Sequence, residues 1–210
     1  MSYLNPDSED AAIEQPTIAL FRNLGWETLN CYHENFGPLS LLGRETMADV
    51  VLPNRLKAAV EKLNPDISPN AIEIAVQELT KDRSAMSAAR ANQAVYRILK
   101  DGVKVTYRKG DDEEEAVESV KVIDWTNAEN NDFLLASQFW ISGDYGKKRA
   151  DLVGFVNGIP LVFIELKASH KKLELAYQKN LSDYRDTIPQ VLWYNAVIIL
   201  SNGSKARIGS

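Results

Sequence analysis

Apolar residues recur along this chain first with the spacing of helices and later with the alternation of strands. The spacing predicts helices over 13–24, 54–63, 69–81 and 84–100, with a short extended stretch near 26–32. Pro16 suits the first turn of the first helix, which puts Glu14 at or beside its N-terminus, and Gly25 ends it. Later runs predict strands over 103–109, 119–125, 133–141, 150–156, 160–166 and 191–200, with one more helix over 171–186.

Strands with few crossover helices indicate an α/β domain built on a mixed sheet. Several of these strands are apolar on both faces, which is typical of central strands covered by helices. We expect a single domain over 1–210, with a helical elaboration over 53–101. The closing residues, SNGSKARIGS, indicate a turn into a further strand that stops short, so we expect this chain to be part of a longer one.

Composition excludes several classes of protein. Of the 210 residues, 45% are hydrophobic and 25% are charged, so the chain can fold around a core and is neither a disordered tail nor a collagen-like fibre. A single cysteine, Cys31, cannot form an internal disulfide, and we expect a reducing, cytoplasmic setting. No apolar run approaches the roughly 18 residues of a membrane span, so we expect no membrane partner.

The charge is unevenly distributed. The net charge is −5, but six acids lie within 111–118, which is most simply a hairpin loop, and the remaining residues sum to +1. From Lys147 to Lys179 seven bases face three acids. The acidic total therefore does not exclude a nucleic-acid partner, which usually binds a basic surface.

Few residues suggest chemistry. His33 and His170 lie far apart in sequence, and no glycine-rich loop for a nucleotide phosphate is present. The remaining candidates are Asp151, Glu165 and Lys167. Glu165 and Lys167 are two apart on one predicted strand, so their side chains leave the same face.

Register decides whether Asp151 joins this pair. A two-residue turn at Asn157-Gly158 with regular pairing would put Asp151 and Glu165 on different faces. A three-residue loop through Ile159, or an equivalent bulge, would place them opposite each other. We predict the loop or its equivalent.

Two converging carboxylates and a lysine suit Mg²⁺-dependent hydrolysis of a phosphodiester. Hard oxygen ligands hold Mg²⁺, and a nearby lysine can orient water or stabilise the transition state. The alternative is a structural cross-strand ion pair in a binding module, because an acid-x-Lys spacing also arises by chance. The residues alone leave both interpretations open.

Five segments closely resemble the N-terminal endonuclease domain of the type I restriction enzyme R subunit, in the PD-(D/E)xK nuclease superfamily. These segments cover nearly the whole chain: EQPTIALFRNLGW (14–26), RLKAAVEKLNP (55–65), NDFLLASQFWI (131–141), RADLVGFVNGIPLVFIELKAS (149–169) and SDYRDTIPQVLWYNAVIILSNGSKARIGS (182–210). The resemblance implies a restriction-endonuclease-like fold, with a mixed central sheet flanked by helices and an N-terminal helical elaboration.

The resemblance also implies roles for single residues. Asp151 and Glu165 would bind Mg²⁺, Lys167 would be catalytic, and Glu14 would assist from the first helix. An acid at a helix N-terminus is also favourable in itself, so Glu14 has a purely structural alternative. In place of the family's Gln-x-x-x-Tyr pattern this chain has Asn180 and Tyr184, which would support the site or only pack on a helix surface.

The partners implied are double-stranded DNA and the modification and specificity subunits of the same complex. Sequence-independent phosphate contacts, or an ordinary solvated surface, would account for the bases Lys147, Lys148, Arg149, Lys171 and Lys172. ATP would act only in the full-length protein, through motor domains whose motifs these residues lack. The runner-up to a nuclease is a non-catalytic module of the same fold that docks DNA or subunits.

Overall fold

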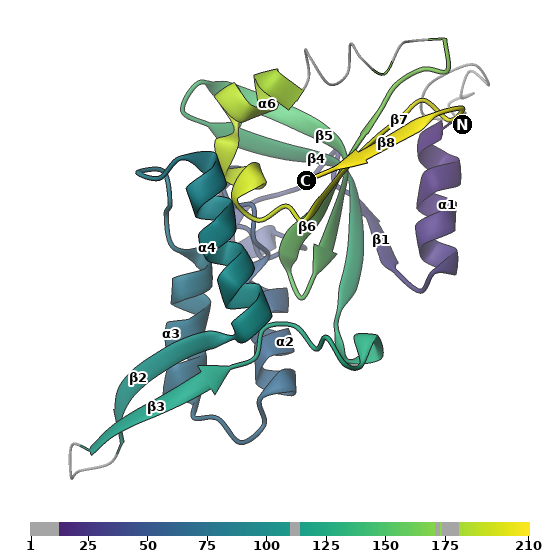
Figure 1. Ribbon diagram of the computed structural model, residues 1–210. Coiled ribbons are helices and arrows are strands. Elements are labelled where there is room, and N and C mark those ends of the chain that lie inside the picture. The colour runs from purple at the N-terminus through teal and green to yellow at the C-terminus, as the bar shows by residue number, and fades with distance from the viewer. Residues whose placement is uncertain (1–12, 110–113, 171–172, 174–180) are drawn as a thin grey trace.

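A mixed six-stranded sheet runs through the centre of the molecule (Figure 1). The structure is a computed structural model that describes residues 13–109, 114–170, 173 and 181–210. The strands of the sheet follow the order β1-β4-β5-β6-β7-β8. Their bounds are β1 (Glu27–Asn30), β4 (Phe133–Gly143), β5 (Gly146–Val156), β6 (Ile159–Leu166), β7 (Val197–Ser201) and β8 (Ala206–Gly209).

Both strand directions occur in this sheet. β4, β5 and β6 form an antiparallel meander joined by tight turns, whereas β1 runs parallel to β4 and β7 runs parallel to β6. β8 returns antiparallel beside β7, as the closing residues predicted. The expected α/β class with a mixed sheet is confirmed.

Helices cover the two faces of the sheet separately. The helices are α1 (Gln15–Asn23), α2 (Pro53–Leu63), α3 (Pro69–Thr80), α4 (Ala88–Asp101) and α6 (Ser182–Thr187), with short 3₁₀ turns η2 (Gly37–Leu39), η3 (Ala128–Asn130) and η5 (Pro189–Trp193). On one face, Ile13 and Ile18 at α1 pack with Leu135, Leu152 and Ile164 of the sheet. Residues of α2, α3 and α4 pack with the other face in a larger core (Figure 1).

The first four helices lie close to their predicted ranges, whereas most of the helix predicted over 171–186 lies outside the described residues, and α6 begins at Ser182. α1 has a proline in its first turn, and Gly25 follows it with a φ of 87°. The helix predicted from residue 84 begins instead at Ala88, because the Ser87 hydroxyl accepts the Arg90 N–H and caps the helix there. In the described part of the chain no helix is both long and apolar enough to cross a bilayer.

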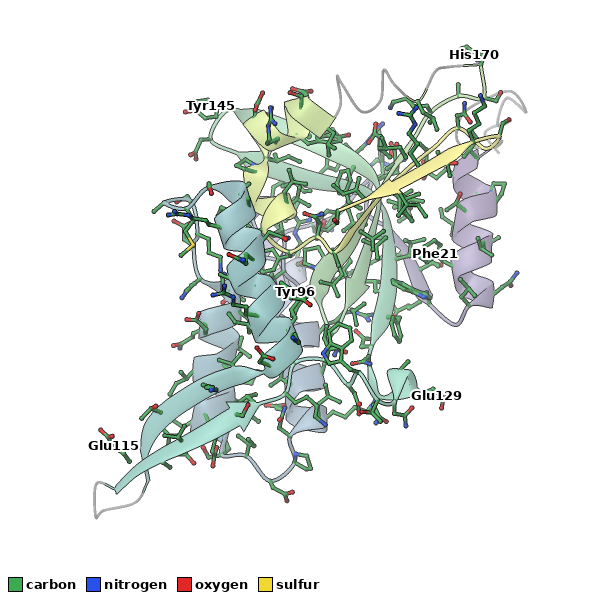
Figure 2. The ribbon with its side chains drawn as sticks, viewed as in Figure 1. Phe21, Tyr96, Glu115, Glu129, Tyr145 and His170 are labelled. Carbon is green, nitrogen blue, oxygen red and sulfur yellow. The ribbon has the colours of Figure 1, made fainter. Side chains whose placement is uncertain are left out.

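The hairpin β2 (Val103–Lys109) and β3 (Glu114–Val120) corrects one prediction. The second strand was expected over 119–125, with 111–118 as the loop, but β3 begins inside the acidic tract. The hairpin can hold these acids because one face meets solvent. Glu115 is exposed at the far end of the hairpin (Figure 2), whereas Glu118 accepts a hydrogen bond from the Tyr107 hydroxyl at 2.8 Å.

The last predicted strand is also too long. Residues 189–193 form η5, and β7 begins only at Val197. Trp193 and Tyr194 are buried in the larger core, and the Asn92 amide of α4 donates to the carbonyls of Leu192, Trp193 and Asn195. The Asn92 side chain of α4 thus donates the hydrogen bonds that a neighbouring strand would have donated to this segment.

Candidate functional site

The turn between β5 and β6 determines which residues meet. It contains only Asn157 and Gly158, both with positive φ (52° and 76°), as tight hairpin turns of this hand require. The predicted three-residue loop is therefore wrong. The Asn157 side chain is fully buried and fixes the turn, because its amide donates to the Val122 carbonyl and its oxygen accepts the Asp132 N–H.

A bulge nevertheless gives the expected register. The β5–β6 pairing shifts by one residue between Gly154 and Phe155, so that Leu161 of β6 is left over. When this register is continued one residue past its last pair, Leu152–Ile164, Asp151 lies level with Glu165. The equivalent bulge, which was the second form of the prediction, is thus the one that occurs.

The predicted carboxylates and lysine come together at this point. The Leu166 N–H donates to Asp151 Oδ2 at 2.7 Å. Lys167 Nζ lies 2.5 Å from Glu165 Oε1, and the Tyr184 hydroxyl donates to Glu165 Oε2 at 2.9 Å. Glu165 is only 3% exposed, so its charge depends on these neighbours.

The two carboxylates also affect each other electrostatically. Burial, and then the negative charge of Glu165, raise the pKa of Asp151 to about 7, against the opposing effects of the Leu166 N–H and Lys167. Burial and the same carboxylate hold the pKa of Tyr184 above its usual range, so its hydroxyl remains a donor. Asp151 and Glu165 therefore repel each other, and Lys167 only partly offsets the effect on Asp151.

This donor set fits a hard divalent cation. Mg²⁺ takes one or two protein carboxylates and completes its shell with water and substrate oxygens. Across the described ranges no group of three or more His, Cys, Asp and Glu side chains is arranged to hold a metal ion. A cation here would accordingly be held by Asp151 and Glu165, with the remaining ligands from outside the protein.

Glu14 reaches the site from the start of α1. It is 6% exposed, makes no capping hydrogen bond to its own helix, and contributes to the raised pKa of Asp151. Its Oε2 accepts a hydrogen bond from Gln138 Nε2 of β4 at 2.6 Å. Glu14 thus lies within electrostatic range of Asp151 without forming a three-carboxylate metal group with Asp151 and Glu165.

The three described bases differ from one another. Lys147 lies over the Trp140 ring at 5.2 Å, and the Arg149 guanidinium lies 5.2 Å from the Tyr32 ring and 5.5 Å from Trp140. Both are exposed. Lys148 instead forms an ion pair with Asp183 of α6 at 2.5 Å. Only Lys147 and Arg149 of these three present their charge without an acidic partner among the described residues.

The remaining candidate residues either lie outside the described part of the chain, contact the carboxylates, or lie apart from them. Lys171, Lys172 and Asn180 lie outside the described residues. Tyr184 does more than pack on a helix surface, because it contacts Glu165 directly. His33 and His170 are exposed, and neither takes part in the cluster.

Sequence reasoning missed Gln138. Together with Ser137 it interrupts the apolar run FLLASQFWI, and that interruption was the available signal. Nothing in the sequence indicated its left-handed backbone, with a φ of 56°, or its contact with α1.

The family model described as "Type I restriction enzyme R protein N terminus" matches residues 7–210. The chain belongs to this family. Its central carboxylates lie within the matched residues.

Two curated relatives extend this result. The HindI type I restriction enzyme endonuclease subunit of Haemophilus influenzae is 34% identical over 206 residues, which cover 94% of this chain and 19% of the relative. The putative MjaIXP endonuclease subunit of Methanocaldococcus jannaschii is 28% identical over 214 residues, covering 97% of this chain and 19% of the relative. The chain spans about a fifth of the length of these relatives.

Proposed function

We propose that this chain is the nuclease domain of a type I restriction enzyme R subunit and that it hydrolyses phosphodiester bonds of double-stranded DNA with Mg²⁺. The observation that carries the proposal is the convergence of Asp151, Glu165 and Lys167 at one place in the sheet. The naming of two relatives as endonuclease subunits supports it. We assign the fold to the PD-(D/E)xK group on the same grounds.

Each residue has a distinct part in this proposal. Asp151 and Glu165 would hold Mg²⁺, which would acidify water and neutralise charge on the phosphate oxygens. Lys167 donates from its ammonium to the attacking water or to the phosphate oxygens. The Leu166 N–H and the Tyr184 hydroxyl fix the two carboxylates by hydrogen bonds. Glu14 assists from α1.

The substrate would be bound without regard to sequence. Of the candidate bases Lys147, Lys148, Arg149, Lys171 and Lys172, we assign phosphate contacts to Lys147 and Arg149, because Asp183 already neutralises Lys148 and because Lys171 and Lys172 lie outside the described residues. In the complete enzyme the modification and specificity subunits would select the site. Motor domains outside this chain would supply ATP-driven translocation before the cut.

One observation favours a second function. Lys167 already pairs directly with Glu165, as a structural ion pair would. A non-catalytic module of this fold that docks DNA or other subunits is the alternative.

The two functions are separated by cleavage assays on the complete restriction enzyme. Glu165→Gln and Lys167→Ala are compared with Glu73→Gln and Lys57→Ala, an exposed ion pair between α3 and α2. We expect the first two variants to lose about a hundredfold or more in DNA cleavage while ATP hydrolysis continues. Cleavage at the rate of the control variants would establish the docking module instead.

A further inference from the structure

Gln138 has an unusual backbone in the middle of β4. Among the described residues other than glycine, only Gln138 and Asn157 have positive φ, and Asn157 is in a turn. Gln138 lies between the pairs Ser137–Leu152 and Phe139–Ala150, so it stands opposite Asp151. A left-handed conformation is unfavourable for a residue with a side chain of this size. The fold holds it at the position that faces a proposed metal ligand.

This conformation reverses the order of side chains on both strands. Ala136 and Phe139 are three apart on β4 yet pack in the same core, and so do Ala150 and Val153 on β5. A regular strand would place on one face only residues separated by an even number. The register is the same on both sides of this point, although Gln138 and Asp151 themselves do not form a ladder pair. Both strands therefore exchange their core-facing and opposite faces at Gln138 and Asp151.

This exchange of strand faces determines where the Asp151 carboxylate lies. Pairing of β5 with β6 stops at Leu152 and Ile164. Two residues further along β6, the Leu166 N–H donates to the Asp151 carboxylate at 2.7 Å. The carboxylate therefore lies between the two strands, beside Glu165.

The Gln138 side chain makes a second connection. Its Nε2 donates to Glu14 Oε2 at 2.6 Å, and Glu14 is almost fully buried. One residue of β4 is thus in register with Asp151 and in contact with Glu14.

We infer that Gln138 is a positioning residue of the nuclease site. Its backbone conformation determines the position of the Asp151 carboxylate, and its carboxamide holds the Glu14 carboxylate by a hydrogen bond. The inference rests on the proposed function. It gives β4 the role of positioning Asp151 and Glu14, a role distinct from metal binding by the carboxylates and from donation by the lysine.

Two substitutions separate the backbone from the carboxamide. Gln138→Gly removes the carboxamide but accepts a left-handed backbone freely, so it is expected to fold. Gln138→Ala removes the carboxamide and also resists that backbone. Gln93→Ala is the matched control, because Gln93 is exposed on α4.

Both are measured in the complete enzyme by DNA cleavage at saturating Mg²⁺ and, without ATP, by the Mn²⁺ dissociation constant from loss of the free-ion electron paramagnetic resonance signal. We expect Gln138→Gly to cut at least fivefold more slowly with a Mn²⁺ dissociation constant within twofold of wild type. Gln138→Ala should show the same loss and at least fivefold weaker Mn²⁺ binding. Because the carboxamide acts through Glu14, the double variant Glu14→Gln, Gln138→Gly should cut no more slowly than Glu14→Gln alone.

Either of two results would overturn the inference. In the first, both Gln138 variants behave like Gln93→Ala. In the second, Gln138→Gly and Gln138→Ala bind Mn²⁺ with the same affinity. Glu165→Gln and Lys167→Ala run in parallel. If they abolish cleavage while the Gln138 variants match the control, the inference fails and the proposed function stands. If they cut normally, the proposed function itself fails.

Discussion

Cys31 is a buried residue whose ionisation can be tested separately from that of the candidate site. Cys31 is 1% exposed, and it lies within electrostatic range of Glu34, which pairs with the buried Arg44 at 2.6 Å. Burial, and then the charge of Glu34, raise the pKa of Cys31 to about 12. An unfolded cysteine ionises near pH 8.5.

The Cys31 thiol is therefore expected to reduce stability at alkaline pH. Between about pH 9 and 12 the folded chain keeps a proton that the unfolded chain has lost, so the free energy of unfolding falls as the pH rises through this window. Urea unfolding of wild type and Cys31→Ala between pH 7 and 10 measures the effect. The variant should lose less stability above pH 9; parallel curves would contradict the pKa assignment.

At the scale of elements, the β5–β6 turn is held by the start of α2. The Leu52 N–H donates to the Gly158 carbonyl at 2.8 Å. A Cβ on Gly158 would lie 2.6 Å from the Leu52 carbonyl oxygen and 2.7 Å from the Leu56 nitrogen. The helices on this face therefore support the hairpin whose register brings the carboxylates together.

Gly158→Ala is expected to destabilise the chain by about 2–4 kcal/mol, because it combines a steric clash with a φ of 76°. Thermal unfolding is the measurement. Gly209→Ala is the control, since a Cβ there meets nothing within 4 Å. Similar unfolding temperatures for the two variants would show that the turn does not depend on α2.

The bases of the β4–β5 hairpin differ in whether an acid neutralises them, because Lys148 pairs with Asp183 whereas Arg149 lies beside aromatic rings. This difference predicts different effects of their substitution on DNA binding. Arg149→Ala should reduce the slope of log affinity against log salt by about 1, because one phosphate contact is lost. Lys148→Ala should leave the slope near wild type, since Asp183 already neutralises Lys148. Fluorescence anisotropy of the chain with a DNA duplex from 50 to 200 mM salt tests this. Equal slopes for the two variants would refute the assignment.

At the scale of the whole molecule, the candidate site lies where separate parts of the chain meet. Glu14 comes from the start of α1, Asp151 and Glu165 from the central strands, and Tyr184 from α6. The repulsion between Asp151 and Glu165 is expected to oppose folding, and a bound cation is expected to offset it. Stability and cation binding should consequently be coupled.

Asp151→Asn tests this coupling. Without metal, the variant should unfold several degrees higher than wild type, because the repulsion with Glu165 is removed while an oxygen remains for the Leu166 N–H. With Mg²⁺, wild type should be stabilised, by about 2.7 kcal/mol at a hundred times the dissociation constant, and the variant should not respond. Thermal unfolding with Mg²⁺ and with EDTA measures both. A variant less stable than wild type in EDTA would favour the structural ion pair.

The sequence by itself determined the elements that depend on neighbouring residues. Periodicity placed α2 and α3 within a residue or two, and apolar runs placed β4, β5 and β6. The two-residue spacing of Glu165 and Lys167 predicted that their side chains leave the same side of the chain, because alternation is a local property of the backbone. The two side chains do pair, although β6 ends at Leu166, one residue before Lys167.

Only the tertiary structure decided how these elements meet. The bulge at Leu161, the left-handed Gln138, and the pairing of Lys148 with Asp183 each depend on a partner distant in sequence or on a backbone conformation that its neighbours impose. For the same reason 191–196 is not a strand: Asn92 of α4 bonds its carbonyls. Local patterns specify which residues could form a site, and long-range packing specifies which of them touch.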